Sequence, residues 1–286
     1  MSIRTVRRLL PAIRDDIADL ITRRPLPAPG LDQLDPFLFL NHHGPQTYPP
    51  GNSGLPFGPH PHRGFETVTF ILDGELAHRD SAGHESIIGA GGVQWMTAGS
   101  GIVHEEVSPR DFRRRGGRLE ILQLWVNLPS RLKMTPPRYI GLQSEDLATF
   151  SEDDGRVTGT LISGAWSGLV GPVHSMTDVQ MATLQFAPDG VLRVSAARER
   201  TVLLYVIRGE LSVSGTMVSP YHLVEMNADG DEIDLRATTE AFILLGHGMP
   251  FNEPVAWHGP FVMNTREEII AAIRDYQAGR LGGSLS

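Results

Sequence analysis

Two short segments carry side chains that could bind a metal ion, and within each segment the two donors are separated by one residue. His60 and His62 form one pair, and His104 and Glu106 form the other. Side chains two residues apart in a β-strand point to the same face of a sheet. Two such pairs on neighbouring strands would aim three imidazoles and one carboxylate at a single point. That donor set suits iron, manganese, zinc, nickel or copper, so we predict one transition-metal site.

The elements that must position these donors are predicted to be strands. Apolar and β-branched runs recur at short spacing between turns rich in Gly, Pro, Asn and Asp, for example at 67–72, 119–126, 202–207 and 241–245. The chain contains 31 Gly and 21 Pro, which favours a β-sandwich or barrel over alternating strands and helices. We therefore expect an all-β fold.

An internal repeat indicates two barrels. Residues 67–76 match residues 202–211 in an apolar strand that ends in Gly-Glu-Leu, at an offset of 135 residues. This predicts two similar barrels in tandem. The same offset places Ser195 and Ala197 where His60 and His62 stand, so the second barrel is predicted to lack the metal site.

These patterns give expected domain boundaries. We predict an N-terminal metal-binding barrel over 1–135, a linker over 136–155 and a C-terminal barrel without metal ligands over 156–286. The linker is predicted from Pro136-Pro137 and the polar, acidic run that follows. One short C-terminal helix is expected. Thr265 and Glu268 form a capping box, apolar residues follow at helical spacing, and Gly279 ends the segment.

Composition excludes several classes of protein. Hydrophobic residues make up 41% of the 286 residues and charged residues 20%, which is typical of a globular protein. The chain has no run of about 18 apolar residues that would predict a membrane span. Without cysteine it has no disulfide and no thiolate metal site. The net charge of −8 argues against direct nucleic-acid binding. We expect a cytoplasmic protein.

Other types of catalytic site are absent from the sequence. It contains no Gly-rich phosphate loop, no Gly-x-Ser-x-Gly elbow and no credible Ser-His-Asp arrangement. An enzymatic function is therefore expected to depend on the metal.

Longer strings resemble a known family. The spacing of Gly54, His60, His62 and Gly74 resembles the first cupin motif, and Gly99-x-Gly101-x-x-His104 resembles the second. More narrowly, the chain resembles the pirin family almost from end to end. The strings that carry this resemblance include HPHRGFETV at 60–68, QWMTAG at 94–99, QLWVNLP at 123–129 and GPFVMNT at 259–265.

The resemblance implies a fold, a cofactor and an activity. It implies two tandem cupin barrels, with one Fe²⁺ in the N-terminal barrel held by His60, His62, His104 and Glu106. It implies a dioxygenase of the quercetin 2,3-dioxygenase type, acting with O2 on a flavonol or similar enolisable aromatic, with Glu106 as general base. The alternative is a non-catalytic, redox-sensitive iron protein that regulates a protein partner. The resemblance also implies a monomer.

The surface near the second donor pair allows two interpretations. Arg110, Arg113, Arg114, Arg115 and Arg118 form a basic cluster. We favour a solvated loop, and a docking patch for a protein partner is the alternative.

Several further side chains could lie near the site. Of the adjacent His42 and His43, at most one can approach the metal, and a structural or surface role is favoured for both. Glu66 is expected either to orient a ligand histidine or to close a hydrogen-bond network near the site. His78 and His84 flank a predicted turn and are expected to be exposed. Another group is expected either to line the barrel mouth or to pack inside it: Gln94, Trp95, Met96, Gln123 and Trp125.

Overall fold

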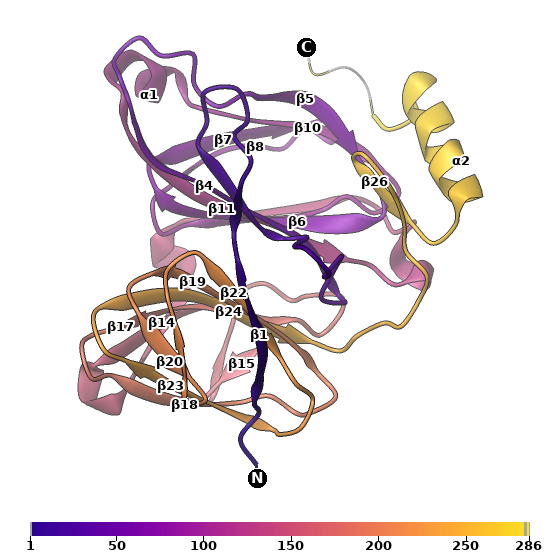
Figure 1. Cartoon of the computed structure of the whole chain (residues 1–286). Helices are drawn as coiled ribbons and strands as arrows, with labels where there is room; N and C mark the ends of the chain where they lie inside the picture. Colours follow the sequence, from indigo (N-terminus) through magenta and orange to yellow (C-terminus); the bar gives the residue numbers. More distant parts are fainter. Residues whose placement is uncertain (1, 283–284, 286) are drawn as a thin grey trace. The chain divides into compact units, whose positions relative to one another are not determined.

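The computed structural model describes residues 2–282 and 285, and its strands form two compact units (Figure 1). The N-terminal unit comprises residues 14–23, 39–145 and 251–286, and the C-terminal unit comprises residues 1–13, 24–38 and 146–250. Each unit is built around one seven-stranded and one four-stranded antiparallel sheet. The predicted all-β fold with two cupin barrels is confirmed.

The sheets of the N-terminal unit hold the predicted ligands. In spatial order, the seven-stranded sheet is β12 (Arg138–Leu142), β9 (Val93–Thr97), β6 (Phe65–Asp73), β11 (Gly117–Asn127), β4 (Phe37–Tyr48), β3 (Thr22–Leu26) and β2 (Ile13–Arg14). The four-stranded sheet is β5 (Phe57–His62), β10 (Ile102–Val107), β7 (Glu75–Asp80) and β8 (Glu85–Gly89). Three smaller elements complete the unit: α1 (Arg110–Arg115), the hairpin of β25 (Ala256–His258) and β26 (Phe261–Met263), and α2 (Arg266–Gln277).

The C-terminal unit also consists of one seven-stranded and one four-stranded sheet, and its strands are connected by a corresponding neighbour order. The seven-stranded sheet is β1 (Val6–Pro11), β22 (His222–Met226), β19 (Thr201–Arg208), β24 (Ala241–Gly248), β17 (Gln180–Phe186), β14 (Val157–Ser163) and β13 (Ala148–Glu152). The four-stranded sheet is β18 (Val191–Ser195), β23 (Glu232–Ala237), β20 (Leu211–Val213) and β21 (Thr216–Val218). A small hairpin joins β15 (Ala165–Trp166) to β16 (Leu169–Val170). Short 3-10 turns lie at Ser130–Leu132, Ser144–Asp146 and Asp153–Gly155.

The internal repeat corresponds to matching strands. Residues 67–72 lie in β6 and residues 202–207 lie in β19, and each strand is third from one end of its seven-stranded sheet. Both strands are largely buried, which the apolar and β-branched residues of these runs allow. The repeat in sequence is therefore a repeat of strand positions.

The division into units differs from the expected boundaries at both ends of the chain. The strand β1 pairs with β22 of the C-terminal unit, and the segment 251–286 belongs to the N-terminal unit. The expected linker over 136–155 instead supplies strands, because β12 pairs with β9 and β13 pairs with β14. Edge strands that arrive from distant parts of the sequence leave no local signal for a domain boundary.

The C-terminal helix forms as its sequence predicts. The Thr265 hydroxyl accepts from the Glu268 backbone N–H, and the Glu268 carboxylate accepts from the Thr265 backbone N–H, so both halves of the capping box are present. Gly279 follows the last turn with φ +69°, a conformation that favours glycine. Ile269 and Ala272 are buried on the face of α2 that packs against the N-terminal unit.

Candidate metal centre

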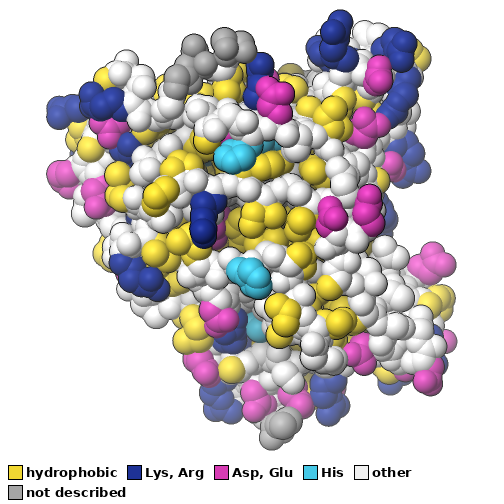
Figure 2. Space-filling view, turned by 180° about the vertical axis from the view of Figure 1, so that it is seen from behind, with side chains coloured by type: hydrophobic (Ala, Val, Ile, Leu, Met, Phe, Trp, Pro, Cys, Tyr) yellow, Lys and Arg dark blue, Asp and Glu magenta, His cyan; other side chains and the backbone are white. Residues whose placement is uncertain are grey.

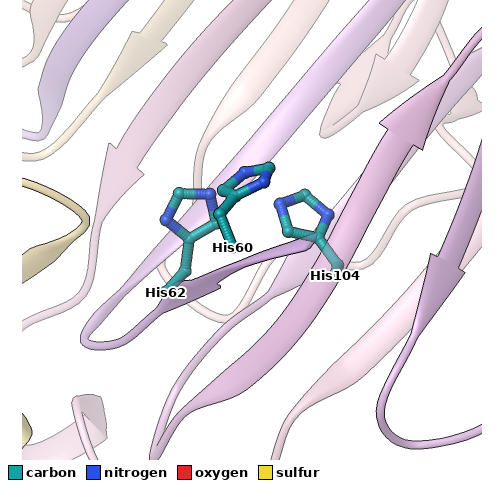
Figure 3. Close-up of side chains that lie close together, drawn as sticks. All are labelled: His60, His62 and His104. Atoms are coloured by element: carbon teal, nitrogen blue, oxygen red, sulfur yellow. The ribbon is translucent and has the colours of Figure 1, made fainter. Parts of the chain in front are cut away.

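Three of the four predicted donors meet inside the N-terminal unit. His60 and His62 come from β5, and His104 lies opposite His60 on the neighbouring antiparallel strand β10. One nitrogen of each ring lies within 4.8 Å of the nitrogens of the other two. Figure 3 shows the three side chains gathered around one space. The alternation of strand side chains thus produces the convergence that the sequence predicts.

Backbone carbonyls determine which ring nitrogen of His60 and of His62 has a lone pair available for a metal ion. His60 Nδ1 lies 2.7 Å from the Gly58 carbonyl oxygen, and His62 Nδ1 lies 3.4 Å from the Pro260 carbonyl oxygen. Because a carbonyl oxygen only accepts, each Nδ1 donates a proton and each neutral ring keeps its lone pair on Nε2. In metal-binding histidines, the nitrogen that does not bind the metal commonly donates a hydrogen bond to a carbonyl or carboxylate.

His104 is the most deeply buried of the three. Its exposed fraction is 0%, and neither ring nitrogen has a hydrogen-bond partner among the described residues. Burial is the main cause that lowers the pKa of His62 and of His104 well below the usual value, and neighbouring histidines add to the effect. The two rings are therefore neutral near pH 7. A bound cation would satisfy buried lone pairs that otherwise cost about 1–3 kcal/mol each, so these side chains fit a metal ion.

Glu106 lies two residues beyond His104 on β10, but its carboxylate is outside the group of mutually close donors. Thr69 Oγ1 donates to its Oε1 at 2.9 Å, and Gln123 Nε2 donates to its Oε2 at 2.6 Å. The carboxylate is therefore fixed in one orientation on the same face of β10 as His104. Direct coordination by Glu106 stays a prediction.

The turn after His62 is held by the C-terminal segment. Arg63 donates from Nε to the Ser100 carbonyl and from Nη1 to Asp275 of α2, both at 2.7 Å. Lys133 is buried and donates from Nζ to the carbonyls of Gly64 and Val262 and to the side chain of Asn127. These contacts fix the β5–β6 corner next to His62.

The structure decides between the two roles expected for Glu66 and contradicts the expectation for His78. Glu66 lies on the opposite face of β6 from Thr69, and Thr97 Oγ1 donates to it at 2.6 Å, so it takes part in a hydrogen-bond network and does not orient a histidine. His78 was expected to be exposed, but it is 3% exposed and its Nε2 lies 3.0 Å from Asp80 Oδ2. The alternating burial of β7 turns both His78 and Asp80 inward.

His42 and His43 have structural partners. They point to opposite faces of β4, as expected for neighbours in a strand. His42 Nε2 lies 2.8 Å from Glu120 Oε1, and His43 Nδ1 lies 2.9 Å from Thr22 Oγ1. Neither belongs to the group of mutually close donors, which agrees with the favoured structural role.

Aromatic rings line the wall beside His62. The Trp125 ring centroid lies 5.3 Å from that of His62, 4.4 Å from that of Phe65 and 4.8 Å from that of Phe39. Trp257 extends this cluster, 5.5 Å from Trp125, and is 37% exposed. Trp125 therefore packs against its neighbouring rings and also lines the site beside His62.

Comparisons with known proteins agree with this geometry. The family model for pirin matches residues 19–126, and the model for the pirin C-terminal cupin domain matches residues 181–282. A Pseudomonas aeruginosa protein, named "putative quercetin 2,3-dioxygenase", is 40% identical over 86% of this chain and 86% of its own length. The chain belongs to the pirin family.

Solved structures share the fold of this pirin. The crystal structure of quercetin 2,3-dioxygenase from Acinetobacter baumannii matches 99% of both chains, with a TM-score of 0.91 and 31% identity. The nickel(II) complex of the bacterial pirin YhhW from Escherichia coli matches 85% of this chain and 99% of its own, with a TM-score of 0.67 and 24% identity. At that lower identity the match shows the fold alone.

The C-terminal barrel of this pirin has an apolar interior where the N-terminal barrel has its donors. The two four-stranded sheets correspond strand by strand, with Leu76 of β7 equivalent to Leu211 of β20. All four equivalent residues belong to one apolar core. In the order of His60, His62, His104 and Glu106, the equivalents are Val194, Ala196, Ile233 and Leu235. The offset of 135 residues had placed Ser195 and Ala197 at the first two positions, one residue too far along.

The basic cluster of this pirin is a short helix rather than the expected loop. Arg110–Arg115 form α1, and three arginines of the cluster already contact carboxylates. Arg114 lies 3.2 Å from Asp111, Arg118 lies 2.9 Å from Asp73, and Arg115 contacts Glu75. On the face shown in Figure 2, basic and acidic side chains are intermixed. In the described part of the chain, no helix is long and apolar enough to cross a membrane.

Proposed function

We propose that this pirin is a metal-dependent dioxygenase that opens the oxygen heterocycle of a flavonol or a similar enolisable aromatic, with iron as the metal in the cell. The observation that carries the proposal is the convergence of three histidines, of which His62 and His104 are buried and His60 and His62 keep their lone pairs on Nε2. The names of the relatives supply the reaction class. The cytoplasmic location and the monomeric state stay predictions of the sequence.

His60, His62 and His104 would hold the metal, with Glu106 as the fourth donor. When bound, a divalent cation supplies Lewis-acid chemistry that lowers the pKa of a substrate hydroxyl. Burial keeps His62 and His104 neutral, and backbone carbonyls fix the rings of His60 and His62. The donor set does not by itself select iron over manganese, nickel, zinc or copper.

Glu106 is the group suited to accept the proton of the substrate hydroxyl. Its two oxygens accept hydrogen bonds from Thr69 and Gln123, so the carboxylate does not rotate freely. A fixed carboxylate on the same strand face as His104 costs little reorganisation when a proton is transferred. The proton would then reside on Glu106 until the product leaves.

The aromatic wall is suited to an aromatic substrate. Phe39, Trp125 and Trp257 form a continuous cluster between His62 and the surface. His60 is partly exposed, whereas His62 and His104 are buried, so the site is closest to solvent on the His60 side. Offset stacking of a planar substrate on such rings is worth about 0.5–1.5 kcal/mol beyond burial.

The experiment combines metal analysis with turnover. Protein purified without oxygen is loaded with iron, and oxygen uptake and carbon monoxide release are followed with quercetin. We expect about one metal per chain and turnover that the Glu106→Gln variant loses by at least 100-fold. The exposed His174 lies in the C-terminal unit, so His174→Ala is a matched control that should keep full activity.

Two outcomes would contradict the proposal. Absence of bound metal would remove the site itself. Stoichiometric iron without oxygen uptake on any flavonol would favour the alternative of a redox-sensitive regulator with a protein partner. Partner capture with a charge-reversed Arg110 and Arg113 pair would then test the basic cluster as the docking surface.

A further inference from the structure

Gln94 has a buried amide that the protein itself does not satisfy. Its side chain on β9 is 2% exposed, and neither Oε1 nor Nε2 has a hydrogen-bond partner among the described residues. Trp125 Nε1 is also buried and also has no hydrogen-bond partner among the described residues. Most buried side-chain polar groups in folded proteins are hydrogen-bonded, so such groups call for an explanation.

Strand pairing places Gln94 beside the two side chains of the seven-stranded sheet that donate hydrogen bonds to Glu106. Thr69 on β6 pairs with Gln94 on one side and with Gln123 on the other. Paired residues of antiparallel strands project from the same face of a sheet, so the three side chains form one polar row. Two members of this row, Thr69 and Gln123, donate to Glu106. Within the described part of the chain, Gln94 is the member of this row whose amide has no hydrogen-bond partner.

The C-terminal barrel shows that the fold does not require this row. Matched strand by strand, the equivalents of Gln94, Thr69 and Gln123 are Val224, Leu204 and Leu245. All three belong to the apolar core of that unit. Because the same arrangement of strands closes around an apolar core, the polar row of the N-terminal barrel serves its site.

We infer that Gln94 is a substrate-binding residue whose Nε2 donates a hydrogen bond to the ketone oxygen of the bound aromatic. A primary amide offers a donor and an acceptor side by side, which complements a ligand that carries a ketone next to a hydroxyl. Trp125 Nε1 offers a second donor from the adjacent register position, where Trp125 pairs with Thr67 and Thr67 with Met96. This inference rests on the proposed function, because it assigns Gln94 to the ketone of the proposed substrate.

A hydrogen bond to the ketone also aids ionisation of the neighbouring hydroxyl. Electron density withdrawn toward the ketone oxygen stabilises the conjugate enolate, so the bond is stronger to the ionised form than to the neutral one. Gln94 therefore discriminates between aromatics by the ketone that they carry, and it favours the form of the substrate that has lost its proton to Glu106.

The test measures ligand affinity and stability together. Binding of 3-hydroxyflavone, flavone and a flavan-3-ol is titrated without oxygen on metal-loaded wild type and on the Gln94→Met variant. The first two ligands carry the ketone and the third does not. We expect Gln94→Met to weaken both ketone ligands by about tenfold and to leave the flavan-3-ol unchanged. Gln185 is exposed on β17 of the C-terminal unit, so Gln185→Met is the matched control and should change none of the three.

Stability gives a second readout with the opposite sign. Methionine has nearly the shape of glutamine and no amide to leave unsatisfied, so the metal-free Gln94→Met variant should melt a few degrees above the wild type. A fall in Tm together with unchanged ketone affinity would mean that the amide is structural, and would overturn the inference. If the wild type binds none of the flavonoids, the proposed function fails. If the wild type binds them and Gln94→Met binds them equally well, the inference alone fails.

Discussion

His247 makes the stability of the C-terminal unit sensitive to acid. Its side chain on β24 is 7% exposed, and Arg200 Nε donates to its Nδ1 at 2.6 Å. Burial is the main cause that lowers the pKa of His247 from 6.5 to about 4, and the charge of Arg200 adds to it. Asp178 acts in the opposite direction. The folded protein therefore keeps His247 neutral at a pH where the unfolded chain protonates it.

The sign and the size of the effect follow from this difference. Below pH 6.5 His247 of the unfolded chain is protonated, whereas His247 of the folded chain stays neutral down to about pH 4. Acid therefore favours unfolding. Stability is complete above pH 6.5 and is lost as the pH falls toward 4. The loss from this group is about 2 kcal/mol at pH 5 and approaches about 3.4 kcal/mol at lower pH.

The His247→Gln variant isolates the group, because glutamine keeps an acceptor for Arg200 and does not titrate. Urea unfolding is measured for both proteins at pH 7.5 and pH 5.0. Between these two values the wild type should lose about 2 kcal/mol more than the variant. The other buried histidines are present in both proteins, so their contribution cancels. Equal losses would refute the assignment of a neutral buried histidine.

Three other substitutions test separate parts of the structure. Thr69→Val removes one donor to Glu106 and should lower kcat about tenfold with little change in metal content, as seen by steady-state kinetics and metal analysis; an unchanged kcat would contradict the anchoring role. Lys133→Met leaves three buried acceptors without their donor and should destabilise the protein by about 2–4 kcal/mol in urea unfolding, and a neutral effect would contradict it. Thr265→Ala removes the N-cap of α2 and should cost about 1 kcal/mol; no measurable loss would mean that the capping box does not contribute to folding.

Residues that act through local periodicity could be predicted from the sequence. The spacing of His60 and His62 and the position of His104 were sufficient because a strand alternates its faces whatever surrounds it. The helix that begins after Thr265 was equally local, since a capping box and a terminal glycine act within a few residues. The second barrel followed from the repeat, although a one-residue difference in the connection after β18 displaced the assigned positions.

Features that depend on pairing between distant strands could not be predicted. Thr69 holds Glu106 only because β6 of the seven-stranded sheet faces β10 of the four-stranded sheet, and nothing in its local sequence sets it apart from Thr67. The Pro260 carbonyl reaches His62 from 198 positions away along the chain. Which of the two expected roles Glu66 takes depended on Thr97 of the neighbouring strand β9, which donates to it. The domain ends were missed because β1 pairs in a different unit from the one that its position suggests.

The proposed function requires that three histidine nitrogens hold one metal ion in the N-terminal barrel. An anomalous difference map, recorded at the iron edge from a crystal of the iron-loaded protein, tests this most directly. We expect a single peak about 2 Å from Nε2 of His60, from Nε2 of His62 and from one nitrogen of His104. A peak at another place would contradict this metal site. A peak at bonding distance from Nδ1 of His60 or His62, and not from Nε2, would contradict the assigned lone pairs.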